Sequence, residues 1–131
     1  MMSAAVLIVD DTPTNLKLAR VVLSAEGLEV RTAISAEDAL KVLETFAPLV
    51  ILMDLQLPGL DGLELTRQLK ADPQRRDIIV LALTAYAMKG DMEKALSAGC
   101  DGYMSKPIDP ATLCAVVQRY LQSETEKKDG D

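Results

Sequence analysis

The chain contains no histidine. Without an imidazole it cannot carry out Ser/His/Asp or Cys/His catalysis, build a histidine zinc site or form a phosphohistidine of its own. Cysteine is scarce as well: the two present, Cys100 and Cys114, form neither a CxxC pair nor a dense disulfide scaffold. We expect both to be small core residues in a reducing cytoplasm. Any chemistry must therefore depend on carboxylates, hydroxyls and lysine.

Positive charge is also in short supply. Lys and Arg number 14 against 20 Asp and Glu, which gives a formal net charge of -6. The sequence thus lacks the basic surface that binds nucleic-acid phosphates, and we expect no nucleic-acid partner. The N-terminus MMSAAVLIVDD has too short an apolar run for a signal peptide. We expect no membrane partner either, because charged residues interrupt every apolar run before the ~18 residues of a spanning helix: Asp10, Asp11, Asp54 and Lys70.

What the sequence does contain is an alternation of short apolar runs and stretches of helical period. Its 131 residues, 49% of them hydrophobic, suit one domain with a single core. The apolar runs predict five strands: Ala4–Val9, Leu28–Thr32, Leu49–Met53, Ile78–Leu83 and Gly102–Met104. The alternation indicates an α/β domain over residues 4–121, with helices on both faces of a parallel sheet. Residues 122–131 lose apolar periodicity, and we expect them to form a charged flexible tail.

Helix boundaries are marked in the sequence. A side chain able to cap a helix precedes proline twice, at Thr12-Pro13 and at Asp109-Pro110. Ser35 and Asp38 have the spacing of a capping box. Glycines follow two of the predicted helices, where a left-handed residue would end them: Gly27 and Gly99.

Polar residues that could carry chemistry follow the predicted strands. All strands of a parallel sheet end at one edge, and ligands bind beyond that edge. Three carboxylates, a hydroxyl and an ammonium are expected there: Asp10, Asp11, Asp54, Thr84 and Lys106. Clustered carboxylates resist ionisation unless a cation neutralises them. Oxygen ligands with few fixed protein donors favour Mg²⁺.

This set of groups suits phosphoryl transfer to a carboxylate. If Asp54 attacks a phosphoryl donor, the metal and Lys106 can neutralise the phosphoryl oxygens, and Thr84 can donate a hydrogen bond to them. A fifth strand two places from the third would leave a gap of about 10 Å. A lysine side chain and a phosphoryl group together can bridge most of that gap.

Four motifs, in this order, resemble the receiver domain of bacterial response regulators. They are V-D-D at Val9–Asp11, L-M-D-L-Q-L-P-G-L-D-G at Leu52–Gly62, L-T-A at Leu83–Ala85 and S-K-P at Ser105–Pro107. The resemblance covers Ala4–Leu121 and implies a flavodoxin-like, CheY-like fold: a doubly wound five-stranded parallel sheet of order 2-1-3-4-5 with five helices. The segment A-Y-A-M-K-G-D after Thr84 is similar to single-domain receivers of the DivK type and to receivers of hybrid kinases.

The resemblance implies roles for the acidic residues. Asp54 would be the phosphoacceptor, and Asp11 and Asp54 would ligate Mg²⁺ together with the carbonyl of Gln56. Asp10 would act on the metal mostly through water. The family is not a classical enzyme: the module assists its own Mg²⁺-dependent phosphorylation and slow dephosphorylation.

The resemblance also implies a switch and partners. Thr84 and Lys106 would contact the phosphoryl group, Tyr103 occupies the family's switch-aromatic position, and the Lys106-Pro107 bond would be cis. The expected function is a stand-alone receiver that takes a phosphoryl group from a histidine kinase or a histidine phosphotransfer protein. It would signal by phosphorylation-dependent binding to a downstream protein.

Other interpretations stay open at this point. An aspartyl-phosphate phosphohydrolase of the haloacid-dehalogenase kind would need an acid where Gln56 stands and room for a cap domain. A pseudo-receiver that binds partners without phosphorylation would not need the complete set of acidic residues. Asp10 and Asp11 could serve only as a turn and cap before the first helix, Thr84 could cap a loop, and Tyr103 could be a half-buried core residue. Met88 and Met92 are expected to fill the core rather than form a docking surface.

Overall fold

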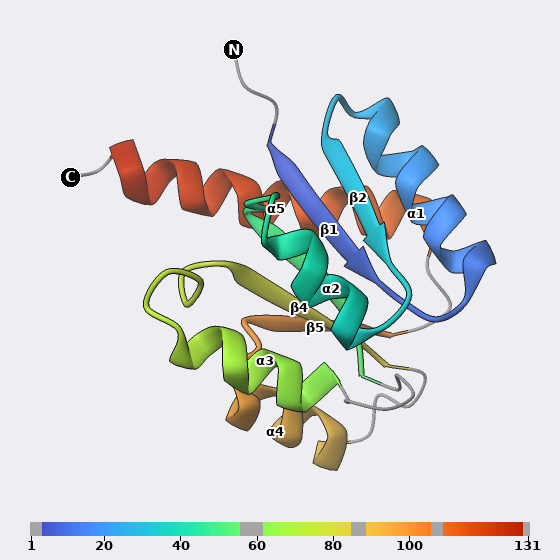
Figure 1. Cartoon of the computed structure of the whole chain (residues 1–131). Helices are drawn as coiled ribbons and strands as arrows, with labels where there is room; N and C mark the ends of the chain where they lie inside the picture. Colours follow the sequence, from blue (N-terminus) through green and yellow to red (C-terminus); the bar gives the residue numbers. More distant parts are fainter. Residues whose placement is uncertain (1–3, 56–61, 85–88, 106–108, 130–131) are drawn as a thin grey trace.

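Strands and helices alternate along the whole described chain of this computed structural model (Figure 1). The structure describes residues 4–55, 62–84, 89–105 and 109–129. The strands are β1 (Ala5–Val9), β2 (Glu29–Ala33), β3 (Val50–Asp54), β4 (Ile79–Thr84) and β5 (Gly102–Ser105). The helices are α1 (Pro13–Ala25), α2 (Ala36–Leu43), α3 (Gly62–Ala71), α4 (Lys89–Ala98) and α5 (Pro110–Asp129).

The strands form one parallel sheet in the order β2-β1-β3-β4-β5. The predicted fold class and strand order are therefore confirmed. Each strand lies within a residue or two of its predicted range. The apolar runs of β1, β3 and β4 reflect burial on both faces of the sheet, whereas the outer strands β2 and β5 are partly exposed. β5 lies two places from β3, as the predicted ~10 Å gap requires.

Two hydrophobic layers cover the two faces of the sheet. Alternate residues of β1 and β3, such as Leu7 and Ile51, pack with residues of α2, α3 and α4 on one face. Their chain neighbours, such as Ile8 and Leu52, pack with α1 and α5 on the other. Figure 1 shows this division: α2 and α3 lie in front of the sheet, and α5 crosses behind it. Since every residue of β3 is buried, this central strand offers a rigid base for the residue at its end.

The helix starts are only partly as predicted. The Ser35 hydroxyl accepts from the Asp38 backbone N–H at 3.0 Å, and the Asp109 carboxylate accepts from the Thr112 backbone N–H at 3.1 Å. Thr12 is a correction: it occupies the N-cap position of α1, but among the described residues its side chain makes no capping hydrogen bond. Its backbone N–H instead donates to the Asp10 carboxylate.

The helix ends also hold one difference from expectation. Gly27 and Gly99 have φ of 84° and 107°, which confirms them as left-handed residues after α1 and α4. Helix α5, however, continues past Leu121 to Asp129, where the sequence suggests a flexible tail. Leu121 is buried in the hydrophobic layer between α5 and the sheet, and the helical backbone continues beyond it. The domain boundary at residue 121 stays a prediction.

A lysine-centred brace ties α3 to the sheet at the edge where the strands begin. The Lys70 Nζ donates to the carbonyls of Arg76 and Ile78 at 3.1 and 2.7 Å and to Asp101 Oδ2 at 2.9 Å. The same Asp101 oxygen accepts from the Val80 backbone N–H at 2.8 Å. One ammonium therefore joins the last turn of α3, the start of β4 and the turn between α4 and β5.

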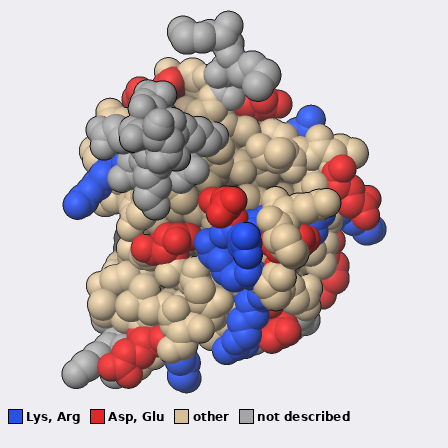
Figure 2. Space-filling view, turned by 90° about the vertical axis from the view of Figure 1, so that its left-hand side faces the viewer, with Lys and Arg blue, Asp and Glu red and all other residues tan. Residues whose placement is uncertain are grey.

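The surface carries mixed charge. Figure 2 shows one face on which acidic and basic side chains are interspersed. Within the described ranges, no helix combines the length and the apolar character needed to cross a membrane.

The capping geometry generates a stability test. We expect Ser35→Ala to lower the free energy of unfolding by about 1 kcal/mol, because the Asp38 N–H loses its capping oxygen. Thr12→Ala, the matched change at the start of α1, should cost less than about 0.5 kcal/mol because no capping bond is lost. Urea unfolding of both variants measures the difference, and equal losses would contradict this account.

Candidate acidic site

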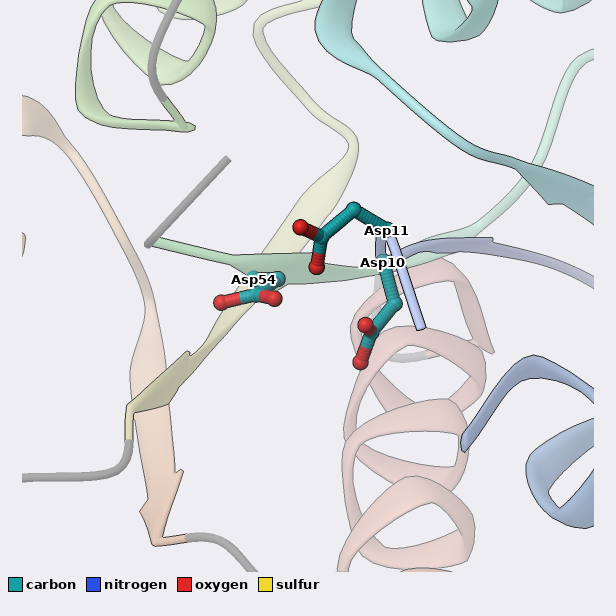
Figure 3. A group of neighbouring side chains, drawn as sticks. All are labelled: Asp10, Asp11 and Asp54. Atoms are coloured by element: carbon teal, nitrogen blue, oxygen red, sulfur yellow. The ribbon is translucent and has the colours of Figure 1, made fainter. Parts of the chain in front are cut away.

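Three carboxylates meet at the edge where the strands end. Oxygens of Asp10, Asp11 and Asp54 all lie within 4.8 Å of one another. Figure 3 shows the three side chains converging on one small region beyond β1 and β3. Asp10 and Asp54 are fully buried, whereas Asp11 is exposed. The structure thus brings together the acidic residues that the sequence places at this edge.

Strand register explains the convergence. β1 and β3 are neighbours, and Val9 pairs with Met53, so the residues that follow these two are adjacent at the sheet edge. Asp54 is held from the other side by its pairing with Leu83 of β4. The Leu55 N–H continues that ladder by donating to the Leu83 carbonyl at 3.0 Å. The backbone at Asp54 is therefore fixed to β4, and the residue before it is fixed to β1.

Asp10 combines two roles that the sequence leaves as alternatives. Its Oδ1 accepts from the Thr12 N–H at 2.8 Å, and its Oδ2 accepts from the Asn15 side-chain amide at 3.3 Å. The Asp10 N–H donates to the Ala33 carbonyl of β2 at 3.0 Å. Asp10 is therefore a local turn residue and a member of the acidic cluster at once. The sequence did not lead us to predict Asn15 as a site residue. Its position five residues after Asp10, at the start of the following helix, is the signal that could have indicated it.

Of the other predicted site residues, Thr84 lies in a described part of the chain, whereas three lie outside the described residues. Thr84 ends β4, is buried and pairs with Ser105 at the end of β5, so it lies on the strand next to β3. Gln56, Lys106 and Pro107 lie outside the described residues. Their predicted roles as metal ligand, phosphoryl contact and cis peptide stay predictions.

Tyr103 lies on the edge strand β5 and is 38% exposed. This exposure puts part of the ring at the protein surface, and it is compatible with both the switching role and its alternative, a half-buried tyrosine. Leu96 of α4, the helix that precedes β5, is also exposed. Met92 is half-buried and Met88 lies outside the described residues. The switch itself stays a prediction.

The cysteines contribute nothing to the acidic site. Cys100 is buried, its Sγ lies 3.9 Å from Thr66 Oγ1, and burial raises the pKa of its thiol. Cys114 is half-buried in α5, and its pKa is also raised, chiefly by desolvation. A raised pKa keeps a thiol protonated and poorly nucleophilic. Cys100 is thus the core residue that the sequence predicts.

The donor set of the cluster suits a hard divalent cation. Two unit charges 4 Å apart repel by about 4 kcal/mol at the effective dielectric near a protein surface. Carboxylate oxygens are the ligands that Mg²⁺ prefers, and Mg²⁺ keeps several waters when protein ligands are few. The exposed Asp11 leaves one side of the cluster open to such waters. The residues present therefore fit Mg²⁺.

Known proteins share this sequence pattern and fold. The family described as the response regulator receiver domain matches residues 6–118. The chain is 42% identical over 120 residues to the polar-differentiation response regulator DivK of Brucella ovis, covering 92% of this chain and 98% of DivK. The chemotaxis response regulator CheY4 of Vibrio cholerae has a similar structure, with a TM-score of 0.86, 28% identity and coverage of 91% of this chain and 99% of CheY4. A CheY-like receiver domain protein of Methanospirillum hungatei superposes with a TM-score of 0.88 and 28% identity, covering 96% of this chain and 99% of that one.

The acidic cluster predicts a metal-dependent stability. Mg²⁺ at ten times its Kd should add about 1.4 kcal/mol to the free energy of unfolding of the wild type, and the melting temperature should rise. Asp11→Ala should lose this response. In EDTA the same variant should melt above the wild type, because one of three repelling charges is gone.

Asp77→Ala is the control for the change in net charge, since Asp77 is exposed in the loop before β4 and distant in sequence from the cluster. It should keep the full Mg²⁺ response. A Mg²⁺ response in Asp11→Ala equal to that of the wild type would place the ion elsewhere.

Proposed function

This chain belongs to the response regulator receiver domain family, and from that membership we propose that Asp54 accepts the phosphoryl group. The observation that carries the proposal is the meeting of three carboxylates at the ends of β1 and β3. Asp54 is the member that lies on the central strand, where it is fully buried and pairs with Leu83 of β4. Family membership also removes the haloacid-dehalogenase alternative.

In the proposed reaction an oxygen of Asp54 attacks phosphorus in a partner's phosphohistidine. A P–O bond forms, the P–N bond breaks, and the electron pair of that bond returns to the imidazole nitrogen. The donor is another molecule because this chain contains no histidine. The chain itself supplies a nucleophile held in place by strand pairing, which reduces the entropy lost in reaching the attack geometry.

We propose that Asp11 and Asp54, with the carbonyl of Gln56, would hold Mg²⁺, and that Asp10 would act mainly through water. The ion would neutralise charge on the carboxylates and on the transferred phosphoryl oxygens. The two hydrogen bonds that Asp10 accepts, from the Thr12 N–H and the Asn15 amide, hold its carboxylate at the start of α1 and leave a lone pair on each oxygen that can accept from a water on the metal. Slow hydrolysis of the acyl phosphate by water would return Asp54 to its unphosphorylated form.

Thr84 and Lys106 are proposed to contact the phosphoryl group after transfer. Thr84 ends the strand beside β3, which supports a hydrogen bond from its hydroxyl to a phosphoryl oxygen on Asp54. Lys106 follows β5, two strands from β3, and would act as a point charge on the same group. A cis Lys106-Pro107 bond would aim that lysine, as in the family.

The proposed partners are a histidine kinase or histidine phosphotransfer protein upstream and a protein target downstream, in the cytoplasm. The 42% identity to DivK, a response regulator, supports this assignment. The mixed surface charge in Figure 2 suits protein partners better than a nucleic-acid backbone.

Phosphorylation at Asp54 can be tested directly. Acetyl phosphate with Mg²⁺ should add one phosphoryl group to the wild type, and Asp54→Asn should abolish the addition because the amide is a poor nucleophile. Intact-mass measurement detects the product. Asp77→Asn, the same change at an exposed aspartate outside the cluster, should be labelled like the wild type.

Equal labelling of Asp54→Asn and the wild type would disprove the assignment. Absence of labelling in the wild type, with both acetyl phosphate and a phosphorylated kinase domain, would favour the pseudo-receiver interpretation.

The output face is proposed to include α4 and β5. The Thr84 hydroxyl, drawn toward a phosphoryl group, would vacate space that the Tyr103 ring could enter, so one hydrogen bond would select between two packings. The exposure of Tyr103 at 38% supports an outward starting position. An energy gap of a few kcal/mol between the packings suffices for such a switch.

Amide NMR spectra with and without beryllium fluoride, a mimic of the phosphoryl group, test this output. We expect shifts around Asp54 and also in α4 and at Tyr103. Thr84→Ala should keep the first set and lose the second, and Thr84→Ser, which retains the hydroxyl, should restore it. Shifts confined to the neighbourhood of Asp10 and Asp54 in the wild type would rule out this output face.

A further inference from the structure

The first residue of α3 lies against the backbone of Asp54. A Cβ atom added at Gly62 would lie 2.5 Å from the Asp54 carbonyl oxygen. It would also lie 3.0 Å from Met53 Cγ and 3.2 Å from Leu55 Cα. Carbon atoms in favourable contact are about 3.5–4.0 Å apart, so the space at Gly62 does not admit a side chain. Only a glycine allows the helix to approach the strand this closely.

The strand cannot move away from such a Cβ. Asp54 pairs with Leu83 on one side, and Met53 pairs with Val9 on the other. The Leu55 N–H holds the chain to β4 directly after the contact. Of the three groups that a Cβ would meet, only the Met53 side chain could rotate, and the closest of them is a backbone oxygen.

The helix is equally constrained. Leu65 and Leu69 of α3 are buried in the hydrophobic layer on that face of the sheet. The Thr66 hydroxyl, also buried, donates to the Gly62 carbonyl at 2.7 Å and so fastens the first turn. A displacement of the helix start by several tenths of an ångström would disturb these contacts.

We propose that Gly62 is a positioning residue for the phosphoacceptor. Its missing side chain lets α3 rest on the Asp54 carbonyl, and this contact sets where the Asp54 carboxylate lies relative to Asp10 and Asp11. The inference rests on the proposed role of Asp54 and adds to it a residue that touches neither the metal nor the phosphoryl group.

The consequence for transfer is geometric. The three carboxylates lie within 4.8 Å of one another, so a small shift of Asp54 changes its distance to both partners. A misplacement of about 1 Å in a reacting group can cost on the order of a hundredfold in rate. Gly62→Ala should therefore slow phosphorylation even where the protein stays folded.

Gly90 provides a matched control. It lies in the first turn of α4, as Gly62 does in α3, but a Cβ at Gly90 would meet none of the described residues within 4 Å. Alanine has the higher helix propensity, so propensity alone predicts that both substitutions are harmless or stabilising. Only the close approach at Asp54 predicts that they differ.

The test compares Gly62→Ala, Gly90→Ala and the wild type with acetyl phosphate and saturating Mg²⁺, below the melting temperature of each protein. We expect Gly62→Ala to be labelled at least about tenfold more slowly, and Gly90→Ala to match the wild type. The carbonyl ¹³C chemical shift of Asp54 should change in Gly62→Ala alone. A purely structural loss would lower the melting temperature without moving either readout in the folded protein.

Thr66→Val is the second variant, in case Gly62→Ala does not fold. It keeps the glycine but removes the hydroxyl bond that fastens the first turn, and it should slow labelling by about two- to fivefold, as expected for one hydrogen bond. Wild-type rates and an unchanged Asp54 carbonyl shift in a folded Gly62→Ala would overturn the inference, as would unchanged labelling of Thr66→Val if Gly62→Ala fails to fold. A wild type that is not labelled at all would instead overturn the proposed function.

Discussion

Mutual repulsion among Asp10, Asp11 and Asp54 is the interaction that the rest of the fold has to balance. Two of these carboxylates are fully buried, and their oxygens lie within 4.8 Å of one another. The pairing of β1 with β3 prevents them from separating, and hydrophobic layers on both faces of the sheet stabilise that pairing. A folded chain thus stores electrostatic energy at one edge, and a cation or a phosphoryl group with its metal can release it.

Several residues at this edge perform a local structural task and a chemical task with the same atoms. Asp10 accepts hydrogen bonds from the Thr12 N–H and the Asn15 side chain at the start of α1, and it also lies in the acidic cluster. Asp54 is both the last residue of β3 and the proposed nucleophile. Such sharing makes the site rigid, because moving a functional group would also break a strand end or a helix start.

The sequence predicts most of the fold and the three carboxylates that meet at one edge of the sheet. Apolar runs locate β1, β3 and β4 because these strands are buried on both faces of the sheet, whereas the outer strands β2 and β5 are partly exposed. It does not predict the hydrogen bond from the Asn15 amide to Asp10, or that the Thr12 side chain makes no capping bond. Both depend on which of several competing hydrogen bonds forms at the start of α1. The sequence analysis predicts the end of α5 at Leu121 from the loss of apolar periodicity, but periodicity reports packing rather than helical backbone. The polar residues after Leu121 contain no helix breaker before Gly130, so the helix can continue to Asp129. The contact at Gly62 depends on a tertiary approach that no local pattern records.

The hydrogen bonds around Lys70 limit how α4 can move against the sheet. The Lys70 ammonium and Asp101 fix the turn between α4 and β5 to the start of β4, and the Asp101 N–H adds a bond to the Val80 carbonyl. The C-terminal end of α4 is therefore held to the sheet, and a swing of α4 would have its largest amplitude at the opposite end of the helix. That opposite end follows Thr84 in the chain. The proposed signal from the end of β4 would thus displace α4 most at the end that follows Thr84 and least at the turn into β5.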